Sequence, residues 1–297
     1  MYQFALIGCG AAGRRHAAAI AQEHRLAIVC DIDKERADDL ASIHKAHALY
    51  SIDELLENIR GIDVVVVCTP NGCHAEHSIK SLQAGCHVLC EAPLSLTGAA
   101  AWQMIETEKY CGRRLFVMHA AEGNSLMSSL KQRIGNNDEQ LFSFELSCAA
   151  PVPQEDSWRR QSFPGGGALH GFFAGEIDLI SYLFGPVAGA SGKLSYEGEL
   201  DISGTADLTM ESGVRGSIAW ALGDGKSRLT IRSFEQEIWS GDTEQFTGEA
   251  DGLYDSYQQF IGVLAGEDRS RLFAATRTVE AIEKIYQSLS SNTATAR

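Results

Sequence analysis

The stretch that decides the fold is Phe4-Ala5-Leu6-Ile7-Gly8-Cys9-Gly10-Ala11-Ala12-Gly13, in which an apolar run leads into a glycine-rich turn. The apolar run predicts a buried strand, and residues 11–23 have the pattern of a helix that starts directly after the turn. The turn matches G-x-G-x-x-G: its glycines allow a tight turn, close approach of a phosphate to the backbone, and close packing of the helix on the strand. A pyrophosphate would lie on the amides at the helix N-terminus, so the sequence predicts a dinucleotide site. Its expected binding residues are Gly8, Gly10, Ala11, Ala12 and Gly13.

The next apolar run, Leu26–Cys30, is followed by Asp31 at the spacing expected for an acid that contacts the adenosine ribose. A carboxylate there accepts hydrogen bonds from the ribose hydroxyls and repels a 2′-phosphate. Asp31 therefore predicts NAD as the cofactor. Arg14 and Lys34 lie near it in the sequence and keep NADP as the less favoured alternative.

The two parts of the chain differ in their pattern of predicted strands and helices. Residues 1–118 alternate short apolar runs with helical patterns, which predicts a Rossmann domain with a parallel sheet. Residues 119–297 contain β-prone runs separated by short glycine-containing turns, which predicts an α+β domain with an open, mainly antiparallel sheet. In this second domain we expect one helix from the glycines at 165–167 to about Leu183, and two helical patterns in the tail, Leu253–Leu264 and Thr276–Leu289.

Composition excludes several classes of function. The chain has 297 residues and a formal net charge of −14, which argues against nucleic acid or an anionic membrane as a partner. The first eight residues have no basic n-region and only a short apolar run, so we expect no signal peptide, and no run approaches the ~18 apolar residues of a membrane-spanning helix. The eight cysteines form no C-x-x-C pair, so we expect reduced core residues of a cytoplasmic protein and no metal site.

Four further segments resemble the glucose–fructose oxidoreductase, inositol dehydrogenase and rhizopine-catabolism family (Gfo/Idh/MocA). They are Gly13-Arg14-Arg15-His16, residues 68–74 (CTPNGCH), residues 84–94 (AGCHVLCEAPL), and Trp158-Arg159 ahead of Gly165-Gly166-Gly167. The resemblance covers nearly the whole chain. It implies a Rossmann domain followed by an open-sheet domain, with NAD(P)-dependent oxidation or reduction of sugars, cyclitols or nucleotide-sugars. It also implies a small-molecule substrate and a homo-oligomer that associates through the open sheet.

The resemblance also assigns site residues by position. The residues expected to line the path of the nicotinamide and its ribose are Thr69, Pro70, Asn71 and His74. Glu91 and Pro93 match the outer positions of the family's E-K-P tripeptide. Trp158 and Arg159 match a family pair, and Arg159 or Arg160 would hold an anionic group of a substrate. For the histidine and the arginines, a surface position without a site role stays an alternative.

The sequence departs from the family where proton transfer takes place. The lysine of E-K-P is Ala92, and the helical Asp and His that the family places four residues apart are Gly171 and Gly175. Hydride transfer to or from a carbinol needs a group that takes or gives the hydroxyl proton. His170 and His119 are the replacement candidates, with local structural roles as the alternative for both.

Three functions remain open at this point. The first is an NAD-dependent oxidoreductase of a sugar, nucleotide-sugar or related polyol with replaced proton-transfer groups. The second is a catalytically degenerate NAD-binding protein that acts as a sensor or assembly subunit. The third is an imine reductase, because a substrate nitrogen needs less help from a lysine.

Overall fold

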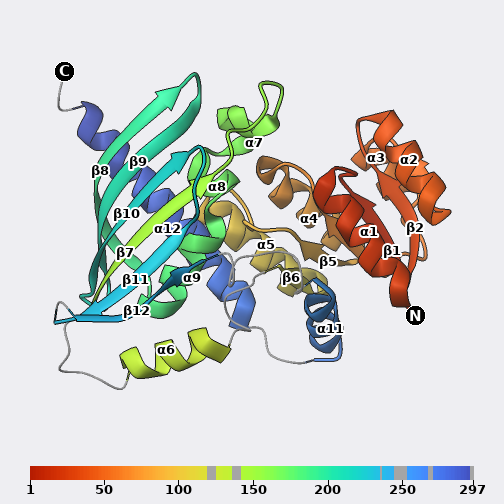
Figure 1. The fold of residues 1–297 in the computed structure, drawn as a ribbon. Coiled ribbons are helices and arrows are strands. Elements are labelled where there is room, and N and C mark those ends of the chain that lie inside the picture. The colour runs from red at the N-terminus through yellow and green to blue at the C-terminus, as the bar shows by residue number, and fades with distance from the viewer. Residues whose placement is uncertain (119–124, 136–141, 235, 244–252, 267–269, 295–297) are drawn as a thin grey trace. The chain divides into compact units, whose positions relative to one another are not determined.

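The computed structural model describes residues 1–118, 125–135, 142–234, 236–243, 253–266 and 270–294. The chain forms two compact units (Figure 1). The first comprises Met1–Ser95, Ala99–Met118 and Ala250–Phe273, and the second comprises Leu96–Gly98, His119–Glu249 and Ala274–Arg297. A segment near the C-terminus thus belongs to the first unit. The domain boundaries expected from the sequence, 1–118 and 119–297, stay a prediction.

The first unit is built on a six-stranded sheet in the order β3-β2-β1-β4-β5-β6, with every pairing parallel. Its strands are β1 (Gln3–Ile7), β2 (Arg25–Cys30), β3 (His47–Leu49), β4 (Val64–Val67), β5 (His87–Cys90) and β6 (Leu115–Val117). The run of four valines in β4 is fully buried, as expected for a strand covered on both faces. The strand order reverses between β1 and β4, where α/β sheets bind ligands at the carboxyl ends of their strands. The Rossmann prediction is confirmed.

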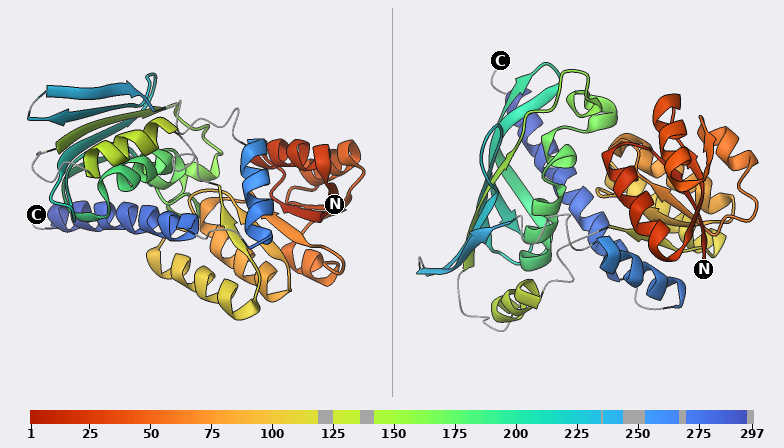
Figure 2. Two further views of the ribbon diagram at one scale, coloured as in Figure 1. Left: turned by 90° about the horizontal axis from the view of Figure 1, so that it is seen from below. Right: turned by 45° about the vertical axis from the view of Figure 1, so that its right-hand side comes forward.

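Helices flank both faces of this sheet (Figure 2). They are α1 (Ala11–Glu23), α2 (Lys34–His44), α3 (Ile52–Glu57), α4 (His74–Gln83), α5 (Gly98–Cys111) and α11 (Leu253–Leu264). Side chains cap two of them: Asp33 accepts hydrogen bonds from backbone amides at the start of α2, and Ser51 from one at the start of α3. Tyr257 and Phe260 of α11 pack in the same core as β1 and α1.

The second unit contains a six-stranded sheet in the order β12-β11-β7-β10-β9-β8. Its strands are β7 (Phe142–Ala150), β8 (Val187–Glu197), β9 (Leu200–Met210), β10 (Arg215–Leu222), β11 (Arg228–Ser233) and β12 (Gln236–Asp242). Only the β10–β7 pair is parallel among these strands, which confirms the expected open, mainly antiparallel sheet. Side chains along β7 alternate between buried and exposed, and α9 (Ala174–Phe184) and α12 (Ser270–Ala294) lie on the apolar face (Figure 2).

The helix expected from residues 165–167 to about Leu183 is not continuous. The chain instead forms α7 (Ser162–Gly165), α8 (Ala168–Gly171) and α9. Gly166 and Gly167 have φ of 82° and 86°, which a right-handed helix cannot contain. Phe172 and Phe173 leave helical geometry with φ of −136° and −120°, and Phe173 is buried in the core. The prediction of one helix was therefore wrong.

All eight cysteines lie within the described residues, and none forms a disulfide. Five of them are buried, and burial raises the pKa of Cys9 and of Cys30 to about 12. These thiols are therefore protonated and unreactive at neutral pH. In the described part of the chain, no helix combines the length and the apolar character needed to cross a bilayer.

Candidate functional site

The glycine-rich loop between β1 and α1 has the shape its sequence predicts. Gly8 has φ of 95°, and a Cβ added there would lie 2.5 Å from the carbonyl oxygen of Cys68. A Cβ on Gly13 would lie 1.9 Å from the carbonyl oxygen of Gly8, because α1 packs directly against the loop. A Cβ on Gly10 would meet no described atom within 4 Å, so this glycine borders open space.

The N-terminus of α1 borders the same loop. Gly10 is its N-cap, and among the described residues no side chain caps this end or adds an acid to the first turn. Amides of a first helical turn are donors that suit an anion. Open space at Gly10 in front of these amides, including those of Ala11 and Ala12, therefore fits the pyrophosphate of a dinucleotide.

Asp31 lies at the end of β2 beside this loop. Its Oδ2 accepts a hydrogen bond from the Cys9 amide at 2.6 Å, and its Oδ1 accepts one from the Asp33 amide at 2.9 Å. A carboxylate oxygen has two lone pairs, so Asp31 retains acceptor capacity for ribose hydroxyls. The two nearby cations have other contacts: Arg14 lies 3.8 Å from Asp39, and the Lys34 ammonium lies 5.0 Å from the centre of the Tyr50 ring.

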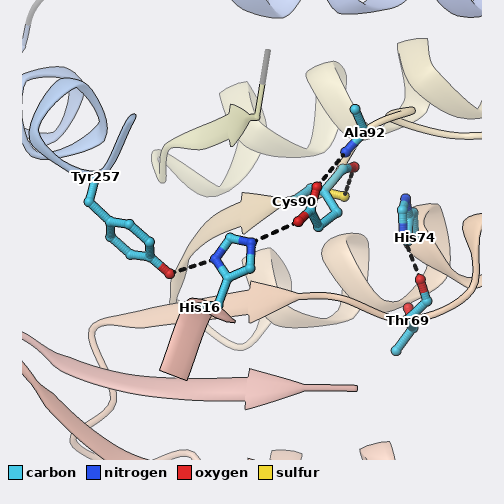
Figure 3. Close-up of polar contacts among 7 residues, drawn as sticks. His16, Thr69, His74, Cys90, Ala92 and Tyr257 are labelled. Atoms are coloured by element: carbon cyan, nitrogen blue, oxygen red, sulfur yellow. Dashed lines mark hydrogen bonds and ion pairs between the residues drawn. The ribbon is translucent and has the colours of Figure 1, made fainter. Parts of the chain in front are cut away.

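The loop after β4 is tied to the loop after β5 by His74. Its ring is buried, with Nδ1 2.8 Å from the carbonyl oxygen of Pro93. Its Nε2 lies 2.7 Å from the carbonyl oxygen of Thr69 (Figure 3). Burial lowers the pKa of His74, and a neutral ring donates to only one of these carbonyls at a time. Asn71 is buried in the same segment, and the Thr69 hydroxyl contacts Nδ1 of His77 at 3.1 Å. The structure thus shows His74 bracing the two loops, and the nicotinamide-lining role of Thr69, Pro70, Asn71 and His74 stays a prediction.

Glu91 lies at the carboxyl end of β5, at the start of the segment that matches E-K-P. Its Oε1 accepts a hydrogen bond from Nε2 of His16 at 2.8 Å, and Nδ1 of His16 lies 2.8 Å from the hydroxyl of Tyr257 (Figure 3). Burial raises the pKa of Glu91, but the hydrogen bond from His16 and the charges of His16, His74 and Arg15 together outweigh it, so that the pKa is lowered overall. Ala92 follows, with no side-chain group that can transfer a proton.

In the second unit, the positions of the family's Asp and His lie on two separate helices. Gly171 ends α8 and Gly175 lies in α9, with Phe172 and Phe173 between them. The expectation that 171 and 175 share one helix face was therefore wrong, because the helix is broken between them. The carbonyl oxygen of Gly171 accepts a hydrogen bond from Nε of Arg159 at 3.1 Å.

Arg159 lies among aromatic rings next to Gly171. Its guanidinium carbon is 4.3 Å from the centre of the Trp158 ring and 5.6 Å from that of Phe172. Arg160, by contrast, forms an ion pair with Glu197 and donates to the carbonyl oxygen of Pro153. Of the two arginines, Arg159 thus stays the candidate for binding an anionic substrate group.

His170 is a buried side chain of α8. Its Nδ1 donates to the carbonyl oxygen of Gly166 at 2.8 Å, its ring stacks on Tyr286, and the backbone of Leu96 also hydrogen-bonds to it. Burial lowers its pKa, so the ring is neutral at neutral pH. These contacts lie within the second unit, and the acid/base role of His170 stays a prediction. His119, the other candidate, lies outside the described residues.

Three important polar residues were not assigned by the sequence reasoning. His16 ends the segment Gly13–His16, for which the resemblance implies no role, and Tyr257 lies 241 residues away from it. Asp201 accepts hydrogen bonds from the Ala168 amide, from Nε1 of Trp220 and from the Tyr286 hydroxyl. No local pattern marks Tyr257 or Asp201, because their partners are distant in sequence.

The comparisons with known proteins agree with this fold. Residues 2–119 match a family model described as "Oxidoreductase family, NAD-binding Rossmann fold", and residues 139–233 match the "GFO/IDH/MocA C-terminal domain". D-glucoside 3-dehydrogenase of Escherichia coli is 34% identical over 187 residues, 61% of this chain and 53% of that protein. Glucose-6-phosphate 3-dehydrogenase of Bacillus subtilis is 27% identical over 195 residues, 62% of this chain and 54% of that protein. The aligned region thus spans about half the length of these curated relatives.

Among solved structures, the WlbA dehydrogenase from Bordetella pertussis in complex with NADH and UDP-GlcNAcA has the same fold. It superposes with a TM-score of 0.83 at 23% identity, over 98% of this chain and 97% of that one. The two family models together cover the first sheet and all strands of the second except β12. The chain therefore belongs to the Gfo/Idh/MocA oxidoreductase family.

Proposed function

We propose that this protein is an NAD(H)-dependent oxidoreductase that acts on a sugar, a nucleotide-sugar or a related polyol without the family's usual Lys, Asp and His. The observation that carries the proposal is the open space at Gly10 in front of the α1 N-terminus, with Asp31 beside it. The matched relatives support the substrate class, since two are named as dehydrogenases of a glucoside and of glucose 6-phosphate.

Each part of the chain has a distinct task in this proposal. Bound NAD⁺ supplies a hydride acceptor. The amides at the start of α1 bind the pyrophosphate, Asp31 accepts hydrogen bonds from the adenosine ribose, and Glu91 accepts one from the nicotinamide half. These three contacts orient the cofactor on one edge of the parallel sheet.

On the substrate side, Arg159 binds an anionic group such as a carboxylate or a phosphate, held by its stack on Trp158. His170 is the candidate acceptor of the carbinol proton. Burial lowers its pKa, so the ring is neutral and has basic capacity at neutral pH.

A second candidate function is supported by one observation. The break between α8 and α9 separates positions 171 and 175, and both positions and Ala92 lack ionisable side chains. A protein that binds NAD(H) without turnover, as a sensor or assembly subunit, has no need of these groups.

The two candidates are separated by a binding measurement followed by a turnover measurement. NADH and NADPH are titrated by fluorescence, and a panel of sugars, sugar phosphates and nucleotide-sugars is then assayed with NAD⁺ at 340 nm. NADH binding with turnover supports the oxidoreductase, whereas NADH binding without turnover supports the sensor. If neither dinucleotide binds at about millimolar concentration, both candidates fail.

Two sets of variants refine the result. Asp31→Ser removes the carboxylate that repels a 2′-phosphate, so it is expected to weaken NADH binding and narrow the preference for NADH over NADPH. If turnover is found, His170→Ala and His119→Ala are tested singly and together. Activity that survives the double change would remove both histidines from the mechanism.

Two further predictions accompany the proposal. The second sheet has a polar face opposite α9 and α12, with Ser143, Glu145 and Ser147 exposed along β7. We expect homo-oligomers to associate through this face, which cross-linking and light scattering would test. A cytoplasmic location likewise stays a prediction.

A further inference from the structure

A buried chain of hydrogen bonds leads from the C-terminal part of the sequence to the edge of the nucleotide site. It runs from Tyr257 on α11 through His16 on α1 to Glu91 at the end of β5 (Figure 3). Both hydrogen bonds are 2.8 Å long. Tyr257 and His16 are 3% and 0% exposed, while the Glu91 side chain is 22% exposed. Only the carboxylate end of this chain therefore reaches the surface.

The chemistry of the partners settles which atom carries which proton. A carboxylate accepts only, so Nε2 of His16 carries the hydrogen that it donates to Glu91. If the ring is neutral, Nδ1 has a lone pair and the hydroxyl of Tyr257 donates to it. Burial raises the pKa of Tyr257 well above its usual value, so this hydroxyl retains its proton. Tyr257 thus favours the tautomer in which His16 faces Glu91 as a donor.

A metal ion is a poor alternative occupant of this cluster. Ligand atoms of His16, Cys68 and Glu91 lie within 4.8 Å of one another, as a metal site requires. Both ring nitrogens of His16 are already hydrogen-bonded, and a metal would have to displace one partner. Burial and the charge of Glu91 raise the pKa of the Cys68 thiol, so that it is protonated and a weak ligand.

We propose that His16 and Tyr257 are positioning residues that fix the Glu91 carboxylate where it binds the nicotinamide half of the dinucleotide. The inference rests on the proposed function. Glu91 lies at the carboxyl edge of the sheet, where the loops after β4 and β5 are braced by His74. The hydrogen bond from His16 fixes the carboxylate before the cofactor binds. The carboxylate therefore accepts a hydrogen bond from the cofactor without a further loss of conformational freedom.

The charged and titratable groups around Glu91 come from every element packed against it. They are Arg15 and His16 of α1, His74 of α4, Cys68 after β4, Cys90 of β5 and Tyr257 of α11. Only Arg15 is a permanent cation. Removal of His16 therefore takes the side-chain hydrogen-bond donor from a largely buried carboxylate and leaves it the Ala92 amide at 3.3 Å, which favours its protonated form.

The test uses four variants with matched chemistry. His16→Leu removes both ring nitrogens, whereas His16→Gln retains an N–H donor near the position of Nε2. Tyr257→Phe removes one hydroxyl from the buried chain. Tyr110→Phe makes the same change at a residue that is 92% exposed in the same unit, and serves as its control.

The first readout needs no cofactor. The side-chain carboxyl of Glu91 is followed by ¹³C NMR from about pH 3 to pH 8, with Glu91→Gln for assignment. The titration midpoint is expected below the usual range for glutamate in wild type, above it in His16→Leu, and near wild type in His16→Gln. An unchanged midpoint in a folded His16→Leu would overturn the inference. If that variant does not fold, a wild-type midpoint within or above the usual range would overturn it.

The second readout is NADH affinity as a function of pH. At pH 7, His16→Leu is expected to bind NADH about 10-fold more weakly and Tyr257→Phe about 3-fold more weakly, since one hydrogen bond is lost or loosened. His16→Gln and Tyr110→Phe are expected to bind like wild type. If Tyr257→Phe lowers the melting temperature while its NADH affinity equals that of Tyr110→Phe, Tyr257 has only a structural role and the positioning role proposed for it is overturned. If wild type itself does not bind NADH, the proposed function fails, and the NMR titration still tests the contact of His16 with Glu91.

Discussion

Alanine at two glycines of the same loop is expected to have opposite consequences. A Cβ at Gly10 meets no described atom within 4 Å, and its backbone, with φ of −70°, suits alanine. A Cβ at Gly13 lies 1.9 Å from the carbonyl oxygen of Gly8 and 3.2 Å from Leu6. Gly10→Ala therefore leaves the fold intact but fills the space proposed for the pyrophosphate, whereas Gly13→Ala forces α1 away from β1.

The magnitudes follow from these contacts. Loss of one charge-assisted hydrogen bond between an amide and the pyrophosphate removes about 1.5–3 kcal/mol, so Gly10→Ala should weaken NADH binding about 10- to 100-fold. At Gly13 the clash is with backbone, and overpacking of that kind costs about 3 kcal/mol or more. Alanine recovers about 1 kcal/mol of helix propensity. Gly13→Ala should therefore destabilise the first unit by about 2 kcal/mol or more.

Thermal melting and NADH titration of both variants check this reasoning. Gly10→Ala should melt with wild type and bind NADH poorly, and Gly13→Ala should melt several degrees lower. The interpretation of Gly10 as the pyrophosphate-facing glycine is refuted if Gly10→Ala binds NADH as tightly as wild type. It is also refuted if Gly10→Ala loses as much stability as Gly13→Ala, because the space at Gly10 would then not be open.

Three other outcomes are expected. Asp201→Asn turns an amide N–H₂ toward a buried donor and should lower the free energy of unfolding by about 2 kcal/mol in urea titrations, whereas exposed Asp207→Asn on β9 should change it little. Burial lowers the pKa of His74 below the 6.5 of an unfolded chain, so the unfolded state binds more protons and stability should fall as the pH drops below about 6.5. Urea midpoints at pH 8 and pH 5.5 measure this, and a rise at pH 5.5 would contradict it. Gly171→Asp places a carboxylate beside Arg159 and should give no gain in turnover across the substrate panel.

The fold could be predicted largely from the sequence because its determinants are local. The buried strands are short apolar runs such as Val64–Val67, and the glycines at 8–13 specify a turn that few other residues allow. Strand β3 was missed because it has only three residues and no apolar run. The position of Asp31 beside the glycine-rich loop could be predicted for the same reason, since both lie within one βαβ unit, while their contacts with a dinucleotide stay a prediction.

Each unit also has buried contacts that no local pattern encodes. Tyr257 is hydrogen-bonded to His16, which lies 241 residues away in the sequence. Asp201 accepts hydrogen bonds from three residues that are 19 to 85 positions away. Gly166 and Gly167 are a local cause of the break between α7 and α8, but the break between α8 and α9 falls at Phe172 and Phe173, where the sequence continues a helical pattern. Burial of Phe173 then holds the interruption in place.

The two positions to which the resemblance assigns the family's Asp and His differ in their local structure. At 171 the backbone carbonyl is engaged by Arg159, and the guanidinium that makes this contact is held by Trp158 and Phe172. At 175 the chain has started a second helix, so an Asp and a His restored at these positions would not share a face. A carboxylate at 171 would pair with Arg159, which lowers its capacity to accept a proton. A carboxylate at 171 and an imidazole at 175 would therefore lie on two helices, α8 and α9, and not on one.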